Sequence, residues 1–329
     1  MGIHCVLCFR DESGEYYKNA FVTLVSIFEN TREKIIVHIL HDDTIHHGRE
    51  ALETLCQKYG HSIFFHHVPE LPPHVAQKVS VTFNLGATYL YYLHEFITAD
   101  KAIYLDCDVI VNMDIVELYS IPMEQHVFAS TLDSIPYWRN GKVRKKYRKT
   151  VDFLQLSEGR YISSGLLLIN VKKLRECMRE ENRFVQLTLA AVDRNIPLPY
   201  PDMDILNSIA HSIPHGVKII DRRFNLWRGS LHLSIEELDN TIFHYVVEPD
   251  SNLFPAHLLF WKYYAKTPFS HDMFRRMSVA FSSEPMDFFQ VYLRNPKHRN
   301  HAVSLLQYGF WRGLFHSIFR KIAPKKNRG

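Results

Sequence analysis

Cysteine is scarce in this chain, and no apolar run is long enough to span a membrane. The five cysteines are scattered and odd in number, which suits a reducing compartment rather than a disulfide-stabilised secreted protein. No stretch reaches the roughly 20 apolar residues that a transmembrane helix needs. The first residues also lack the basic region of a signal peptide. We therefore expect a cytoplasmic protein without a transmembrane segment.

A strong net charge is also missing. Lysine and arginine total 39 against 35 acidic residues, which gives a formal net charge of +4. Neither internal repeats nor low-complexity segments are visible. With 46% hydrophobic and 22% charged residues, the composition is that of an ordinary globular protein. A chain of 329 residues can hold one large α/β domain with an appendage, or two modest domains.

Strand-like and helix-like segments alternate at the start of the chain. Residues 3–9, 34–40 and 62–68 are strand-like, while residues 17–30 and the segment after Thr44 have helical spacing. This alternation predicts a parallel, doubly wound sheet. A helix is expected at residues 84–96, and later strands are expected at residues 102–105, 127–131, 166–170, 217–220 and 241–245.

Two aspartates follow the apolar strand at residues 102–105. Asp106 and Asp108 are separated by one residue, so in an extended chain their side chains point the same way and can converge on one ion. The carboxyl edge of an open α/β sheet is where ligands bind, and paired carboxylates suit Mg²⁺ or Mn²⁺. The spacing alone is common, since Asp202 and Asp204 repeat it, and a strand end exposed to water would explain it equally well.

Basic residues are concentrated in two places. Residues 139–149 hold seven lysines and arginines, which predicts either a solvated loop or a mobile lid that meets a phosphate or an acidic acceptor. Near the C-terminus, apolar and aromatic residues recur at helical spacing over residues 308–323, among basic residues. This second pattern predicts an amphipathic helix that lies on a membrane surface or docks on the protein.

Five short blocks follow one another in the chain: YLDCDV from Tyr104, GLLLIN from Gly165, DMDILN from Asp202, RFN from Arg223 and HY from His244. In this order they resemble glycosyltransferase family 8, which includes bacterial lipopolysaccharide galactosyl- and glucosyltransferases and glycogenin. The resemblance covers about residues 3–270 and implies the GT-A fold, a Rossmann-like α/β domain with a mostly parallel central sheet and helices on both faces. We expect residues 1–250 to form this catalytic domain and residues 251–329 to form a helical appendage.

The resemblance implies a metal site formed by Asp106, Asp108 and His244. Mixed carboxylate and imidazole ligands suit Mn²⁺ better than Mg²⁺, and the ion would neutralise charge on the leaving nucleoside diphosphate of a UDP-sugar. The resemblance also places Asp202 at the anomeric carbon, where it would attack that carbon or stabilise its positive charge. Capping of a helix is the alternative role for Asp202.

Several of the implied donor contacts depart from the family pattern. No arginine stands in the helix that contains Tyr91, the usual Asn is Ser163, and the usual Gln is Met203. The lysine expected after the HY block is missing from residues 246–250. The resemblance therefore implies altered sugar and phosphate contacts or low activity. The positions that it assigns to nucleotide-sugar binding are Asp11, Glu12, Ser13, Ser163, Ser164 and Tyr91.

The resemblance thus implies a metal-dependent, retaining hexosyltransferase of class EC 2.4. It would move glucose or galactose from a UDP-sugar to a cell-surface saccharide or glycolipid, as in lipopolysaccharide biosynthesis. The amphipathic tail would hold it as a peripheral protein on the inner face of the cell membrane. One alternative is a sugar-nucleotide-binding relative with weak catalysis. A second is a nucleic-acid-binding protein that uses the two basic regions, which the low net charge disfavours.

Overall fold

The computed structural model describes residues 2–45, 48–80, 85–133, 135–227, 230, 233–246, 255–273 and 275–276. The chain divides into two compact units. The first comprises Met1–Gly229 and Glu236–Pro249, and the second comprises Ser230–Ile235 and Asp250–Gly329. The candidate site lies entirely in the first unit.

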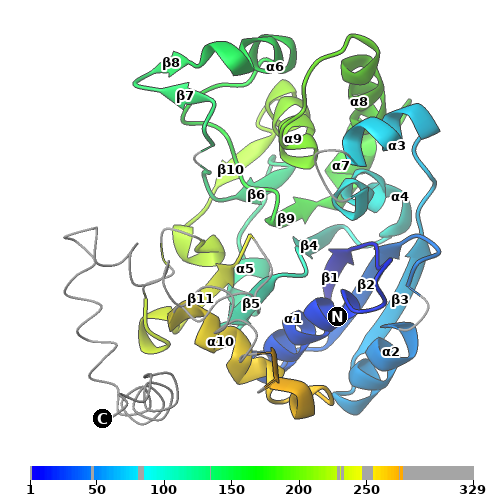
Figure 1. The fold of residues 1–329 in the computed structure, drawn as a ribbon, viewed down its shortest axis with the longest axis vertical. Coiled ribbons are helices and arrows are strands. Elements are labelled where there is room, and N and C mark those ends of the chain that lie inside the picture. The colour runs from blue at the N-terminus through cyan, green and yellow to red at the C-terminus, as the bar shows by residue number, and fades with distance from the viewer. Residues whose placement is uncertain are drawn as a thin grey trace, which may run out of the picture. The chain divides into compact units, whose positions relative to one another are not determined.

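A seven-stranded sheet forms the centre of the first unit, with the strand order β10-β6-β9-β4-β1-β2-β3 (Figure 1). All neighbouring strands are parallel except at β9, which runs antiparallel to both β4 and β6. The expected mostly parallel sheet is therefore confirmed. Its strands are β1 (Ile3–Cys8), β2 (Ile35–His41), β3 (Ser62–His67), β4 (Lys101–Leu105), β6 (Phe128–Ser130), β9 (Leu166–Asn170) and β10 (Val217–Ile219).

Helices lie on both faces of this sheet (Figure 1). On one face, a large apolar cluster joins strand residues such as Val6 and Tyr104 to helix residues such as Leu93, Phe184 and Ile205. The long helices of the unit are α1 (Tyr17–Asn30), α2 (Gly48–Lys58), α3 (Pro73–Ser80), α8 (Arg183–Asp193) and α9 (Pro201–Ser212). The shorter helices are α4 (Leu93–Phe96), α5 (Val116–Tyr119), α6 (Arg148–Leu154) and α7 (Val171–Cys177), with 3₁₀ turns η1 (Leu85–Tyr92), η2 (Lys145–Tyr147), η3 (Arg222–Asn225) and η5 (Glu236–Leu238).

Two small antiparallel ribbons extend the architecture. Strand β5 (Val109–Asn112) pairs with β11 (Thr241–His244), and β7 (Trp138–Arg139) pairs with β8 (Lys142–Val143). The turn between β4 and β5 holds Asp106 and Asp108, and we call it the D-x-D turn. The first ribbon follows it directly, so the sheet edge and the ribbon share that turn. In the second unit, the described residues form helix α10 (Pro255–Tyr264) and the 3₁₀ turn η6 (Ser270–Asp272).

Two local expectations differ from the structure. The helix expected over residues 84–96 is a 3₁₀ helix, η1, followed by the single α-helical turn α4. Nearly all of η1 is buried, so packing rather than helix propensity decides its path. The basic segment expected as a loop is instead the β7–β8 hairpin, η2 and the start of α6. In the ranges that the structure describes, no helix is long and apolar enough to cross a membrane.

Candidate active site

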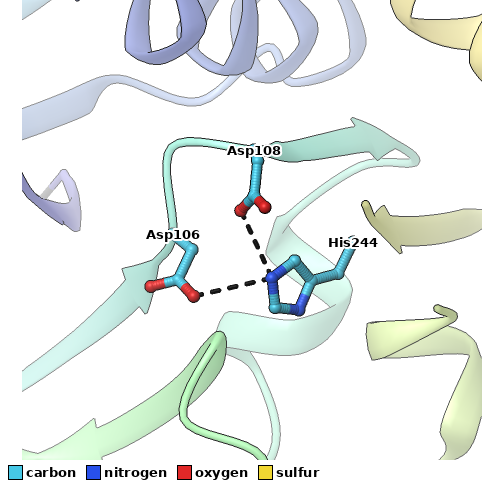
Figure 2. A group of neighbouring side chains, drawn as sticks. All are labelled: Asp106, Asp108 and His244. Atoms are coloured by element: carbon cyan, nitrogen blue, oxygen red, sulfur yellow. Dashed lines mark ion pairs between the residues drawn. The ribbon is translucent and has the colours of Figure 1, made fainter. Parts of the chain in front are cut away.

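The candidate metal ligands meet where strand β4 ends. Asp106 and Asp108 lie in the turn between β4 and β5, and β11 runs antiparallel to β5 with His244 opposite Val109. This pairing brings a histidine from late in the chain beside the two aspartates. Figure 2 shows the three side chains pointing toward one another.

The geometry of this triad is compact. His244 Nε2 lies 3.5 Å from Asp106 Oδ2 and 3.2 Å from Asp108 Oδ1. One ligand atom from each residue lies within 4.8 Å of the other two. The side chains are only partly covered, with exposed fractions of 29% for Asp106 and 15% for Asp108. The ligand atoms therefore line one small space that solvent can reach.

Neighbouring elements hold the D-x-D turn in place. The hydroxyl of Thr23 on α1 lies 2.8 Å from the carbonyl oxygens of both Cys107 and Val109. The Tyr104 hydroxyl donates to Asp106 Oδ1 at 2.6 Å. Such outer contacts orient metal ligands and reduce the entropy lost when an ion binds.

Gly165 is required by the close packing at this site. A Cβ atom at this position would lie 2.1 Å from Cε1 of His244 and 3.0 Å from Asp106 Oδ2. The backbone of residue 165 also accepts a hydrogen bond from the Asp106 amide at 3.0 Å. Only glycine lets this strand approach the triad so closely. The sequence shows the glycine in its block, but its role follows from the fold.

The pKa values reflect the mutual attraction within the triad. Burial raises the pKa of Asp106 to about 6, while the charge of His244 opposes this shift. Burial also acts to lower the pKa of His244, but the Asp108 and Asp106 carboxylates outweigh it and raise that pKa to about 9. Without an ion, the histidine is thus protonated and acts as the counter-charge of the aspartates. A cation that displaced this proton would meet two carboxylates and one neutral imidazole.

The chemistry of this donor set fits a divalent cation. Two hard oxygen ligands and one imidazole leave positions for substrate oxygens or water. Because Gly165 has no side chain, its backbone packs against His244 and Asp106 and leaves the space between the ligand atoms open. Among the described residues this is the single group of three or more His, Cys, Asp or Glu side chains with such spacing.

Asp202 lies in the first turn of α9, where it is 5% exposed. Its Oδ2 accepts a hydrogen bond from the Ser164 hydroxyl at 2.6 Å, and burial raises its pKa. Its Oδ1 is buried and has no hydrogen-bond partner in the described part of the chain. The N-cap of α9 is Tyr200, so Asp202 is not the capping residue. A buried carboxylate oxygen without a partner is costly unless a ligand satisfies it.

Ser163, shortly before β9, and Tyr91, in η1, are two further positions that the resemblance assigns to nucleotide-sugar binding. Ser163 is 4% exposed, and its hydroxyl accepts a hydrogen bond from the Gly165 amide at 3.3 Å. Tyr91 is fully buried, stacks on Phe184, and donates its hydroxyl to the Pro201 carbonyl at 3.1 Å. Tyr91 therefore supports the start of α9 rather than presenting its side chain to solvent.

The turn after β1 combines one buried carboxylate with two exposed side chains. The Asp11 carboxylate accepts backbone hydrogen bonds from Tyr16 at 2.8 Å and Tyr17 at 3.2 Å, and its side chain is buried. It therefore stabilises the beginning of α1. Glu12 is exposed and pairs with Arg10 at 2.8 Å, and Ser13 donates its hydroxyl to Asp11 at 3.3 Å. Glu12 and Ser13 are the accessible members of this turn.

Sequence reasoning missed two supporting groups. Tyr104 precedes Asp106 by two residues on an extended strand, so alternation could have indicated its contact with the aspartate. Asp204 is fully buried and accepts hydrogen bonds from the hydroxyls of Tyr137 at 2.6 Å and Tyr161 at 2.8 Å. No local pattern connects these tyrosines to Asp204, because they come from separate segments.

Comparison with known proteins gives a consistent family assignment. The model of the family described as "Glycosyl transferase family 8" matches residues 4–247. A Haemophilus influenzae protein whose name is a provisional assignment as a glycosyltransferase is 30% identical over 205 residues, or 62% of this chain. The chain spans 58% of the length of that relative.

Two solved structures share the fold. The galactosyltransferase LgtC, in complex with donor and acceptor sugar analogues, superimposes with a TM-score of 0.61 at 19% identity, covering 81% of this chain and 96% of LgtC. The bifunctional glycosyltransferase WbbM, without ligands, gives a TM-score of 0.63 at 16% identity, covering 84% of this chain and 52% of WbbM. At these identities the two structures show the fold alone.

Proposed function

The chain belongs to glycosyltransferase family 8, and on this premise we propose that it is a metal-dependent, retaining hexosyltransferase. It moves glucose or galactose from a UDP-sugar to a saccharide or glycolipid acceptor. The observation that carries the proposal is the convergence of Asp106, Asp108 and His244 beside the buried carboxylate of Asp202. That LgtC has been crystallised with donor and acceptor sugar analogues supports the choice of substrates.

The residues of the site would contact three different parts of the donor: the diphosphate, the nucleoside and the sugar. Asp106, Asp108 and His244 would hold a Mn²⁺ ion, or Mg²⁺, which would neutralise charge on the diphosphate. Glu12 and Ser13 face the nucleoside. The neighbouring Asp11 carboxylate would accept a further hydrogen bond from it. Asp202 faces the sugar, where its Oδ1 stabilises positive charge at the anomeric carbon. Ser164 keeps Asp202 oriented through its short hydrogen bond.

The bond changes are those of glycosyl transfer. The bond between the anomeric carbon and the β-phosphate oxygen breaks, and the electron pair leaves with UDP. A hydroxyl oxygen of the acceptor bonds to the anomeric carbon on the same face, and its proton passes to the departing diphosphate. The Tyr91 side chain is buried and does not reach the sugar. Stabilisation of positive charge at the anomeric carbon therefore depends mainly on Asp202.

Thermal unfolding with nucleotides tests the donor site. Wild-type protein is melted with UDP, GDP and CDP, each with and without Mn²⁺, alongside Asp108→Ala and the control Asp193→Ala. Asp193 is exposed at the end of α8, where an acid is unfavourable. We expect UDP to raise the melting temperature only with Mn²⁺, because specific binding stabilises the folded state. The shift should vanish in Asp108→Ala and persist in Asp193→Ala.

Two outcomes would count against the proposal. Absence of a shift with any nucleotide would remove the donor site. A UDP shift that Asp108→Ala retains would place the nucleotide away from the D-x-D turn.

Hydrolysis of UDP-glucose and UDP-galactose separates transfer from mere binding. A transferase slowly hydrolyses its donor, and Asp202→Asn should slow this at least tenfold without abolishing the UDP shift. Binding of UDP with no detectable hydrolysis of either donor would favour the alternative of a sugar-nucleotide-binding relative. The burial of Tyr91, in a helix where the family pattern has an arginine, is the observation behind that alternative, together with Met203 and the missing lysine after His244.

A further inference from the structure

A strongly basic segment begins five residues after Asp133 and has no role in the proposed site so far. We define residues 138–149, from β7 through η2 to the start of α6, as the basic arm. No acidic residue occurs between Asp133 and Asp152. All seven cationic side chains of the arm are exposed: Arg139, Lys142, Arg144, Lys145, Lys146, Arg148 and Lys149.

The charge of the arm is not balanced by its surroundings. Several other surface cations of the unit are paired, such as Arg49 with Glu53 at 3.2 Å and Arg10 with Asp42 at 3.1 Å. Within the described ranges, no ion pair involves any of the seven arm cations. One acid beside the arm is Glu158, whose Oε2 would lie 3.9 Å from a Cβ on Gly141, and another is Asp152 on α6, which forms no ion pair in the described ranges. Such a surplus of one sign creates a potential that attracts anions.

The arm is anchored to the helix that carries Asp202. Tyr137, directly before the arm, is fully buried and donates its hydroxyl to Asp204 at 2.6 Å. The Arg144 amide donates to the Tyr137 carbonyl at 2.8 Å, which closes the arm onto this anchor. Just after the arm, Thr150 donates to the Pro197 carbonyl at 2.7 Å. The arm is therefore an ordered element with a defined position relative to α9.

The arm also continues directly from the edge of the site. Its chain leaves β6 through Thr131, whose carbonyl accepts a hydrogen bond from the Ser163 amide at 3.1 Å, and Asp133, whose amide donates to the Tyr161 carbonyl at 2.8 Å. Trp138 follows five residues later, so at about 3.5 Å per residue the arm begins within roughly 18 Å of Asp133. Strand β6 lies on the opposite side of β4 from β1, whose following turn holds Glu12 and Ser13. In Figure 1 the hairpin lies at the same end of the unit as α6 and α9.

We propose that the basic arm binds negatively charged groups, phosphate or carboxylate, on the acceptor, so that the acceptor of this enzyme is an anionic saccharide. This inference rests on the proposed transferase function. It follows from the unpaired charge of the arm, its anchoring to the helix of Asp202, and its place on the side of the site away from the nucleoside turn. The guanidinium and ammonium groups of the arm would bind the charged part of the acceptor and would not contact the reacting atoms.

Other polyanions fit the arm less well. Insertion into a bilayer needs an exposed apolar face, whereas Trp138 and Tyr147 are partly buried and packed against Tyr137. Binding of single-stranded nucleic acid relies on exposed aromatic rings, and the Tyr147 ring is instead covered by Lys146 at 4.5 Å. A charged saccharide needs only the exposed cations.

Binding of a matched pair of sugars tests this inference. The probes are maltohexaose and sulfated maltohexaose, both with the same fluorophore at the reducing end, followed by fluorescence anisotropy. The arm variant is Arg139→Gln/Lys142→Gln/Lys145→Gln. The control variant, Arg32→Gln/Lys34→Gln/Lys172→Gln, removes the same charge from exposed positions outside the arm. Both variants and the wild type are also melted with UDP and Mn²⁺.

We expect the wild type and the control variant to bind the sulfated sugar similarly and to prefer it to the neutral sugar. The arm variant should bind the sulfated sugar about tenfold more weakly, because three surface charges are lost from one place. All three proteins should keep the same UDP shift. Loss of that shift in the wild type would refute the transferase function rather than the role of the arm.

Three results would overturn the inference while the UDP shift persists. One is equal binding of the sulfated sugar by the arm and control variants. A second is arm-dependent binding to phosphatidylglycerol vesicles, but not to phosphatidylcholine vesicles, with no effect on sugar binding, which would make the arm a membrane contact. A third is arm-dependent binding of oligothymidine that exceeds binding of the sulfated sugar, which would make it a nucleic-acid contact.

Discussion

Individual residues at the site are held by short-range packing that tolerates little change. Gly165 is the clearest case, because its backbone contacts the Asp106 amide while its missing side chain leaves room for the His244 ring. Val246, two residues after His244, has φ of 65°, a conformation that a β-branched residue rarely adopts. Unfavourable backbone geometry of this kind is concentrated at functional sites.

Replacement of Gly165 by alanine should damage the metal site. The new Cβ would overlap His244, so the ring must move away from the aspartates, and Mn²⁺ affinity should fall about 10- to 100-fold. Isothermal titration calorimetry with Mn²⁺ measures this effect. Gly60→Ala serves as the control, because Gly60 has φ of 75° and open space around it. It should lose about 1 kcal/mol of stability and keep its Mn²⁺ affinity; equal affinities in Gly165→Ala and wild type would contradict the prediction.

Asp204 should make stability depend on pH. Burial raises its pKa in the folded protein to about 7, against the hydrogen bonds from Tyr137 and Tyr161. In the unfolded chain the carboxyl ionises near pH 4, so the folded state holds the extra proton between these values. The stabilisation is full below about pH 4 and is lost as pH rises through about 7.

Urea unfolding of the wild type and Asp204→Asn measures this dependence. Between about pH 5 and about pH 8, the free energy of unfolding of the wild type should fall relative to that of Asp204→Asn by about 2–4 kcal/mol. Asp152→Asn, at an exposed position on α6, should follow the wild-type profile. Parallel profiles for the wild type and Asp204→Asn would show that Asp204 is not the titrating group.

At the scale of elements, the site depends on contacts between segments far apart in the sequence. Strand β11 brings His244 to the D-x-D turn, and α1 holds that turn through Thr23. Helix α9 connects Asp202 to the basic arm through Asp204 and Tyr137. The arrangement of the proposed reaction centre and of the acceptor surface therefore depends on the same helix.

The hydrogen bond between Tyr137 and Asp204 should hold the arm in place. Tyr137→Phe leaves a buried carboxylate with one partner fewer, which should cost about 1–3 kcal/mol and increase local opening of the arm. Limited digestion with trypsin reports this, because the arm contains seven cleavage sites. Tyr161→Phe removes a similar bond to Asp204 from outside the arm. Cleavage in the arm should accelerate several-fold in Tyr137→Phe alone; equal rates in both variants would mean that global stability governs cleavage.

At the scale of the whole molecule, the C-terminal segment predicted as a basic amphipathic helix concerns where the protein acts in the cell. Residues 308–323 lie outside the described residues. The pattern of apolar and basic residues there predicts binding to anionic lipid surfaces. We therefore propose that the protein acts as a peripheral protein on the inner face of the cell membrane, where a glycolipid acceptor would be available.

Deletion of residues 308–329 should abolish sedimentation with liposomes that contain phosphatidylglycerol. The double variant Phe315→Ser/Phe319→Ser keeps the basic charge and should reduce binding as well, because apolar burial contributes to an interfacial helix. The arm variant defined above should bind these liposomes like the wild type. Unchanged sedimentation of the truncated protein would refute a membrane role for the tail.

The alternation of strands and helices, the paired aspartates and the family could be predicted from the sequence, because local periodicity and short blocks in a constant order carry them. Residues 17–30 were predicted as a helix and form α1 with those bounds. The spacing of Asp106 and Asp108 followed from the geometry of an extended chain, which needs no knowledge of other segments.

Which residues meet at the site depends on how distant segments pack in the folded chain. The pairing of β5 with β11 brings His244 to the aspartates, and packing on α9 buries Tyr91 under Pro201. The Asp11 carboxylate turns toward the α1 amides, and Asp204 collects hydroxyl groups from separate segments. These contacts join positions far apart in the chain, where the pattern of neighbouring residues carries no information about the partner. Packing of the core and satisfaction of buried polar groups choose among the partners that local structure permits.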